Sequence, residues 1–127
     1  MEKEIISTDN APAAIGPYSQ AVKLGNLVYT SGMIPVVPES GEIVSGDVAQ
    51  QTRQAIKNLE AVLKEAGTNL DNVLKTTVFI KNMNDFAIIN EAYKEFFTSS
   101  FPARSCVEVA RLPKDVLIEI ECIAVIK

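Results

Sequence analysis

The sequence predicts an α+β domain in which a single β-sheet carries two helices on one face. Two segments have apolar residues at the helical period, and the segments around them have the composition and alternation of strands. Two right-handed crossovers into one sheet would place both helices on the same side of it. The 127 residues contain no internal repeat, low-complexity tract or linker, so we expect one domain over residues 1–127.

The first third of the chain is expected to form strands. Three extended or β-rich runs cover residues 4–7, 19–24 and 27–34. Gly25-Asn26 is a turn signal between the second and third runs. Gly32 interrupts the third run, which predicts a bulge or a close approach of the backbone to another group. A loop marked by proline and glycine, residues 35–46, ends this part of the chain.

Two helices are expected, with a strand over 73–80 between them. In the first, Asp47 is the expected N-cap with Gln50 three residues later, and Gly67 marks the end. Its buried stripe is expected to contain Thr52, Ala55, Ile56, Leu59, Val62, Leu63 and Ala66. Asn84 is expected to cap the second helix. Its inward-facing residues are interpreted as core, not as a base-stacking platform: Phe86, Ile89, Tyr93, Phe96 and Phe97.

The last third predicts two strands, 103–109 and 116–126, on either side of residues 111–115. Alternation assigns one set to the helix side: Ser105, Val107, Val109, Ile118, Ile120 and Cys122. The opposite set mixes charged with bulky apolar side chains: Arg104, Cys106, Glu108, Leu117, Glu119, Glu121, Ile123 and Val125. Because no helix is left to cover that second face, we expect it to be an oligomer interface.

The short connection predicts antiparallel pairing of these two strands. If residue 109 opposes residue 116, Cys106 lies opposite Glu119 and Arg104 opposite Glu121. A guanidinium, a thiol and carboxylates would then share one edge of the uncovered face.

The composition excludes several function classes. The chain has no histidine, which removes histidine-based metal sites, histidine general bases and Ser-His or Cys-His pairs. Its two cysteines, Cys106 and Cys122, are too few and too far apart for a zinc knuckle, and they do not suggest a secreted disulfide scaffold. Because neither a metal-ligand cluster nor a Schiff-base lysine motif is apparent, we expect no metal and no cofactor.

Charge and hydropathy bear on the partners. A net charge of −4 disfavours nucleic acid as a partner, since phosphate binding needs clustered Lys and Arg. No run of about 18 apolar residues suggests a membrane span, and the N-terminus has no long apolar segment. A cytoplasmic location is the expectation.

Several blocks of sequence are similar to one known family. They are Gly16-Pro17-Tyr18, Thr30-Ser31-Gly32, residues 75–79 (KTTVF) and, above all, residues 101–109 (FPARSCVEV). The chain resembles the RidA family, formerly YjgF, of reactive intermediate (enamine/imine) deaminases, from about Asn10 to its end. The resemblance implies a chorismate-mutase-like α+β fold and a homotrimer with active clefts between subunits. It also implies cofactor-independent hydrolysis of 2-imino acids, such as 2-iminobutanoate and 2-iminopropanoate, to 2-oxo acids and ammonia.

The resemblance also implies the site residues. Arg104 matches the family's arginine for the substrate carboxylate, and Glu119 matches its water-positioning glutamate. Cys106 matches the site cysteine, which lines the pocket and is not required as a nucleophile. Four further residues match the remaining pocket positions: Tyr18, Ser31, Gly32 and Asn90. Met33 and the short 98–100 loop depart from the family pattern, which leaves the preferred imino acid open.

Other interpretations remain open at this stage. Arg104 could be a salt-bridged surface residue, Cys106 a small buried hydrophobe and Tyr18 a turn anchor. One of Glu119 and Glu121 is expected to be structural. The alternative functions are a 2-oxo acid binding trimer without turnover and, less favoured, a ribonuclease or translation inhibitor. A carboxylate binder has no need for Glu119 beside the anion, so that residue discriminates the enzyme from the binder.

Overall fold

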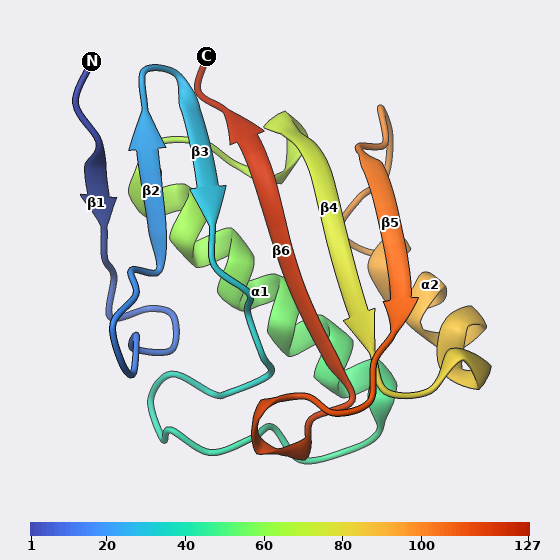
Figure 1. Ribbon diagram of the computed structural model, residues 1–127. Helices are drawn as coiled ribbons and strands as arrows, with labels where there is room; N and C mark the ends of the chain where they lie inside the picture. Colours follow the sequence, from blue (N-terminus) through green and yellow to red (C-terminus); the bar gives the residue numbers. More distant parts are fainter.

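The computed structural model describes residues 1–127 as one mixed sheet with two helices on a single face (Figure 1). The main elements are β1 (Glu4–Ile6), β2 (Ala21–Leu24), β3 (Leu27–Thr30), α1 (Val48–Ala66), β4 (Val73–Ile80), α2 (Phe86–Lys94), β5 (Ala103–Glu108) and β6 (Ile118–Val125). The strand order is β1-β2-β3-β6-β4-β5, and only β4 and β5 run parallel. The predicted α+β architecture, with both helices on one side, is confirmed.

The boundaries of α1 are those that the capping signals predict. The Asp47 carboxylate accepts a hydrogen bond from the Gln50 N–H at 3.1 Å. Gly67 ends the helix in the left-handed conformation, with φ of 92°, which a residue without a Cβ adopts at little cost. The predicted buried stripe of α1 is also confirmed, because every one of its residues is buried.

The predicted cap of the second helix is wrong. A short 3₁₀ turn, Met83–Asp85, precedes α2, and Asn82 caps that turn by accepting from the Asn84 N–H at 2.9 Å. Asp85 occupies the N-cap position of α2 without a side-chain hydrogen bond. The extra turn moves the capping asparagine two residues upstream of the predicted position.

The third strand is shorter than expected. Regular pairing stops at Thr30, and the chain rejoins the sheet at a single bridge between Met33 and Ile120. Gly32 lies in this interruption. The predicted irregularity at Gly32 is therefore confirmed, while the predicted continuous strand to residue 34 is not.

The predicted pairing of the last two strands is wrong. β4 lies between β5 and β6, so the two final strands are not neighbours. β4, α2 and β5 form a right-handed crossover unit that places β5 parallel to β4, and β6 enters between β3 and β4. The predicted pairs Cys106–Glu119 and Arg104–Glu121 therefore do not exist.

The face assignment holds for β6 and is reversed for β5. Ile118, Ile120 and Cys122 are buried beneath the helices as predicted. On β5, however, Arg104 pairs with Thr76 and Cys106 with Val78, and both of these β4 residues face the helices. The Arg104 and Cys106 side chains therefore belong to the helix side of the sheet, and Ser105 and Val107 to the uncovered side.

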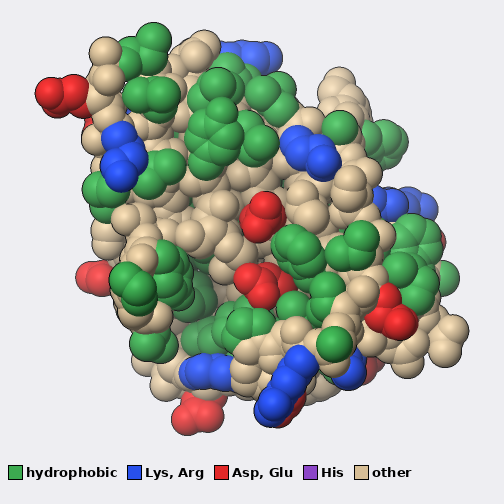
Figure 2. Space-filling model, in the orientation of Figure 1, with side chains coloured by type: hydrophobic (Ala, Val, Ile, Leu, Met, Phe, Trp, Pro, Cys, Tyr) green, Lys and Arg blue, Asp and Glu red, His purple; other side chains and the backbone are tan.

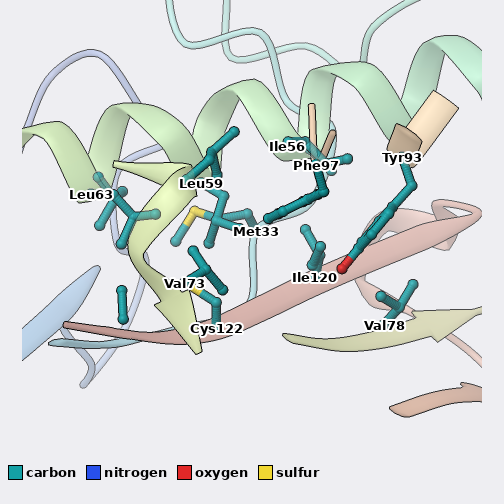
Figure 3. Close-up of a cluster of buried hydrophobic side chains, with 14 of the residues drawn as sticks. Met33, Ile56, Leu59, Leu63, Val73, Val78, Tyr93, Phe97, Ile120 and Cys122 are labelled. Carbon is teal, nitrogen blue, oxygen red and sulfur yellow. The ribbon is translucent and has the colours of Figure 1, made fainter. Parts of the chain in front are cut away.

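The core lies between α1 and the centre of the sheet (Figure 3). Side chains with almost no exposed surface fill this layer, among them Ile56, Leu59, Leu63, Val78 and Ile120. Each such aliphatic side chain stabilises the fold by about 1.5–3 kcal/mol on burial. Neither α1 nor α2 combines the length with the apolar composition that a membrane-spanning helix needs.

The other face of the sheet has no covering element. Figure 2 shows hydrophobic side chains spread over it, with acidic ones among them. One row of paired residues crosses the face from β1 to β5: Ile5, Val22, Tyr29, Ile123, Lys75 and Ala103. Tyr29 and Val107 are each 43% exposed there, which is a large apolar exposure for strand residues.

Candidate functional site

Arg104 lies at the sheet edge beneath α2. Its Nη1 donates to the Asn90 Oδ1 at 2.8 Å. Its guanidinium carbon lies 5.0 Å from the Tyr93 ring centroid and 5.5 Å from that of Phe86. The four ion pairs of the chain all involve other residues, so Arg104 is not the salt-bridged surface residue that one interpretation allowed. An exposed guanidinium without a counter-ion is a suitable group for an anionic ligand.

An open hollow of about 580 Å³ lies beside this guanidinium. Its walls are formed by Asn90, Tyr93, Phe101, Pro102 and Arg104, together with Glu91 and Lys94, which form an ion pair with each other at 3.6 Å. Phe101 is 67% exposed, so the hollow has an apolar rim next to a cationic group. That combination matches a small molecule with a carboxylate at one end.

Cys106 lies two residues after Arg104 on β5 and therefore on the same side of the sheet. Its side chain is half-buried and packs against the core. Burial raises the pKa of the Cys106 thiol, and the nearby Arg104 charge offsets part of that rise. A thiol that is harder to ionise is a weak nucleophile, which agrees with a lining role.

Glu119 lies on the opposite, uncovered face. Its carboxylate rests over Gly32, since a Cβ built at that glycine would overlap Oε2 and come within 2.7 Å of Cδ. Burial raises the pKa of Glu119, and the neighbouring charge of Glu121 raises it further. Glu119 is thus a half-buried carboxylate that holds a proton more readily than an ordinary glutamate.

Ser31, Gly32 and Tyr18 lie near one another. The Ser31 hydroxyl donates to the Ser19 carbonyl at 2.6 Å. Tyr18 borders one hollow together with Ser31 and a second, of about 220 Å³, together with Gly32. The Tyr18 hydroxyl accepts from the Ile15 N–H at 3.3 Å, so the residue also anchors its own turn, as the structural interpretation expected.

Gln20 is a residue that sequence analysis missed. It is 4% exposed, and its amide donates to the Thr8 and Pro12 carbonyls at 3.0 and 2.7 Å while accepting from the Thr8 N–H at 2.7 Å. These bonds hold the 8–12 loop that forms one wall of the smaller hollow. A glutamine at a strand start is ordinary in a sequence, so only its burial identifies the clamp.

The candidate residues form two groups on opposite sides of the sheet. Arg104, Cys106 and Asn90 lie on the helix side, whereas Glu119 and Gly32 lie on the uncovered side. The prediction that guanidinium, thiol and carboxylates share one edge of the uncovered face is wrong. The reason is the register of β5: its parallel pairing with β4 places the Arg104 side chain on the helix side of the sheet, toward α2. No group of three or more His, Cys, Asp or Glu residues could hold a metal ion.

These features define a class: a small α+β domain with an uncovered apolar sheet face, a free guanidinium and a half-buried carboxylate. The chain matches the family model described as Endoribonuclease L-PSP over residues 8–126. It belongs to this family, the YjgF/RidA family, as the sequence blocks predicted.

Relatives and solved structures agree with that assignment. The chain is 60% identical over 123 residues to the 2-iminobutanoate/2-iminopropanoate deaminase of Escherichia coli K12, covering 94% of this chain and 95% of the relative. A Rid-family structure from Yersinia pestis matches with a TM-score of 0.95 and 50% identity over 98% and 100% of the two chains. Escherichia coli TdcF with bound serine matches with a TM-score of 0.93 and 54% identity over 98% and 99%.

Proposed function

We propose that this protein is a 2-imino acid deaminase that hydrolyses 2-iminobutanoate, 2-iminopropanoate and similar imines without a cofactor. The observation that carries the proposal is Arg104: an exposed guanidinium, held by neutral groups and lacking a counter-ion, beside an open hollow. The 60% identical relative named as such a deaminase supports the same reaction.

The working unit in this proposal is a cytoplasmic homotrimer of chorismate-mutase-like domains with a site between subunits. Arg104 and Glu119 lie on opposite sides of the sheet, so a site that uses both needs a second copy of the chain. Arg104, Cys106 and Asn90 come from one subunit. Tyr18, Ser31, Gly32 and Glu119 come from its neighbour. The apolar character of the uncovered face supports its burial against other subunits.

In the proposed reaction, Arg104 binds the substrate carboxylate through two parallel N–H donors. Glu119 accepts a proton from a water molecule as the water oxygen bonds to C2 of the imine. That proton passes to the nitrogen and gives a carbinolamine, which carries a hydroxyl and an amino group on C2. Glu119 then transfers the hydroxyl proton to the amino nitrogen, so that the C2–N bond breaks, ammonia leaves and the 2-oxo group forms. A carboxylate whose pKa is raised by burial suits this exchange, because it can both take and return a proton.

The family model's description makes a nuclease the second function to test. A chain with no histidine and a net charge of −4 lacks the usual groups for binding and cleaving RNA. The non-catalytic alternative is a trimer that only binds 2-oxo acids.

The test is a coupled assay. An amino-acid dehydratase generates the imine from serine or threonine, and release of the 2-oxo acid is timed with and without this protein. Faster release that disappears in Arg104→Ala supports the proposal. Binding of 2-oxobutanoate without acceleration would instead identify a binder. Cleavage of RNA by the purified chain that persists in a metal-free control would identify a nuclease.

A further inference from the structure

Arg104 is oriented by three neutral side chains from one stripe of α2. Phe86, Asn90 and Tyr93 lie at positions i, i+4 and i+7, which place them on a single helix face above β5. The guanidinium contacts all three, through one hydrogen bond and two aromatic rings. The helical period of the sequence predicts only a core role for these two aromatic residues.

Tyr93 is itself fixed in place from two directions. Its ring stacks on Phe97 with centroids 4.4 Å apart and an interplanar angle of 24°. Its hydroxyl shares a hydrogen bond of 2.9 Å with the fully buried Thr76, the residue that pairs with Arg104 on the neighbouring strand. Figure 3 shows the Tyr93 side chain reaching from its helix toward the sheet. The ring under the guanidinium is therefore part of the rigid core.

Because Arg104 has no counter-ion, its orientation depends on these neutral contacts. A carboxylate beside Arg104 would also orient it, but would neutralise its charge and compete with an incoming anion. An aromatic ring attracts a cation through its face and accepts no hydrogen bond from the edge of the guanidinium. Rings can thus restrict the side chain while its N–H donors and its charge stay available.

We propose that Phe86 and Tyr93 are positioning residues that hold the Arg104 guanidinium in the orientation that binds a carboxylate. The inference rests on the proposed role of Arg104 as the carboxylate ligand. It assigns a binding contribution to residues that need not touch the substrate. Tyr93 supplies the fixed ring, and the half-buried Phe86 supplies the second ring nearer the start of the helix.

The decisive variant is Phe86→Leu, which keeps an apolar side chain and removes the ring. The dissociation constant for 2-oxobutanoate, measured by NMR titration of the folded protein, should rise about three- to thirtyfold, the range expected for a cation–π contact. In turnover, KM should rise by a similar factor with kcat near the parent value, since the contact acts on bound substrate and transition state alike. Phe86→Tyr should restore both constants.

Two controls separate positioning from packing. Phe96→Leu makes the same change at another half-buried aromatic that does not contact Arg104, and should leave binding unchanged. Tyr93→Phe keeps the ring and loses the bond to Thr76 that helps to fix it, so it should lower thermal stability and should weaken binding of 2-oxobutanoate less than Phe86→Leu does.

A double-mutant cycle completes the test. In an Arg104→Ala background, Phe86→Leu should weaken binding no further, because the cation it positions is gone. Parental binding by Phe86→Leu, or equal weakening with and without Arg104, would overturn the inference. So would parental binding by Arg104→Ala. If the protein binds 2-oxobutanoate with this dependence but hydrolyses no imine, the proposed function fails and the positioning role stands.

Discussion

Replacing Gly32 with alanine tests the carboxylate half of the proposed site without touching a polar atom. A Cβ at this position would overlap Glu119 Oε2 and lie 2.7 Å from Cδ and 2.9 Å from Cγ, whereas real Cβ atoms stay at least 3.0 Å from such neighbours. The carboxylate, being the flexible partner, must therefore move by roughly 1 Å. A misplacement of about 1 Å in a reacting group costs on the order of a hundredfold in rate. We expect Gly32→Ala to lower kcat by about that factor.

Stability should respond very differently. Gly32 does not have a positive φ, so alanine fits its backbone conformation without strain. Such a substitution commonly stabilises by about 0.4–1 kcal/mol through the unfolded chain. That gain and the cost of moving one half-buried carboxylate nearly offset each other. Thermal unfolding of Gly32→Ala should therefore stay close to that of the parent.

The assay is release of 2-oxobutanoate from enzymatically generated imine, with binding of 2-oxobutanoate measured in parallel. Gly32→Ala should bind the 2-oxo acid through Arg104 while turning over slowly. The Gly32→Ala/Glu119→Gln double variant should be no slower than Glu119→Gln alone, because both changes act through one carboxylate. A folded Gly32→Ala protein with parental kcat would refute the reasoning that places Glu119 at the reaction centre.

Four further predictions follow from the same geometry. Arg104→Lys should lose about a hundredfold or more in kcat/KM and Arg104→Ala more still, because a lost charged hydrogen-bond partner costs about 2–5 kcal/mol; parental activity in either variant would contradict this. The parent's kcat/KM should fall as pH decreases through the raised pKa of Glu119, because the protonated carboxyl cannot accept a proton from water. Glu121→Gln removes the like charge and should move that acid limb to lower pH, which a pH–rate profile checks. Light scattering should give about three times the 13.8 kDa chain mass, and a monomer would remove the shared site. Activity should survive a chelator, and loss that zinc reverses would show a metal requirement.

Much of the fold is determined by local sequence signals. α1 begins after Asp47 and ends at Gly67, because an N-cap and a left-handed residue affect only the few residues next to them in the chain. The alternation along β6 places Ile118, Ile120 and Cys122 in the core because the period of a strand is local. The family blocks likewise lie in the sequence itself, so family membership needed no coordinates.

The strand partners, and the side of the sheet to which each β5 residue belongs, depend on long-range packing. A short connection favours a hairpin, but the crossover through α2 brings β5 beside β4, and the apolar β6 gains more burial between β3 and β4 than at an edge. Parallel pairing with Thr76 then turns Arg104 toward α2. Since alternation fixes only which residues share a side, and not which side faces the helices, sequence alone could not separate Arg104 from Glu119.

The same distinction explains the surroundings of each site residue. The family blocks of the sequence are sufficient to identify an arginine, a glutamate and a glycine at the family's positions. That Phe86 and Tyr93 flank Arg104, and that Glu119 rests on Gly32, depends on contacts between segments far apart in the chain. Such contacts form because burial of the α1 and α2 faces sets the distance from helix to sheet, a long-range packing effect with no local sequence signal.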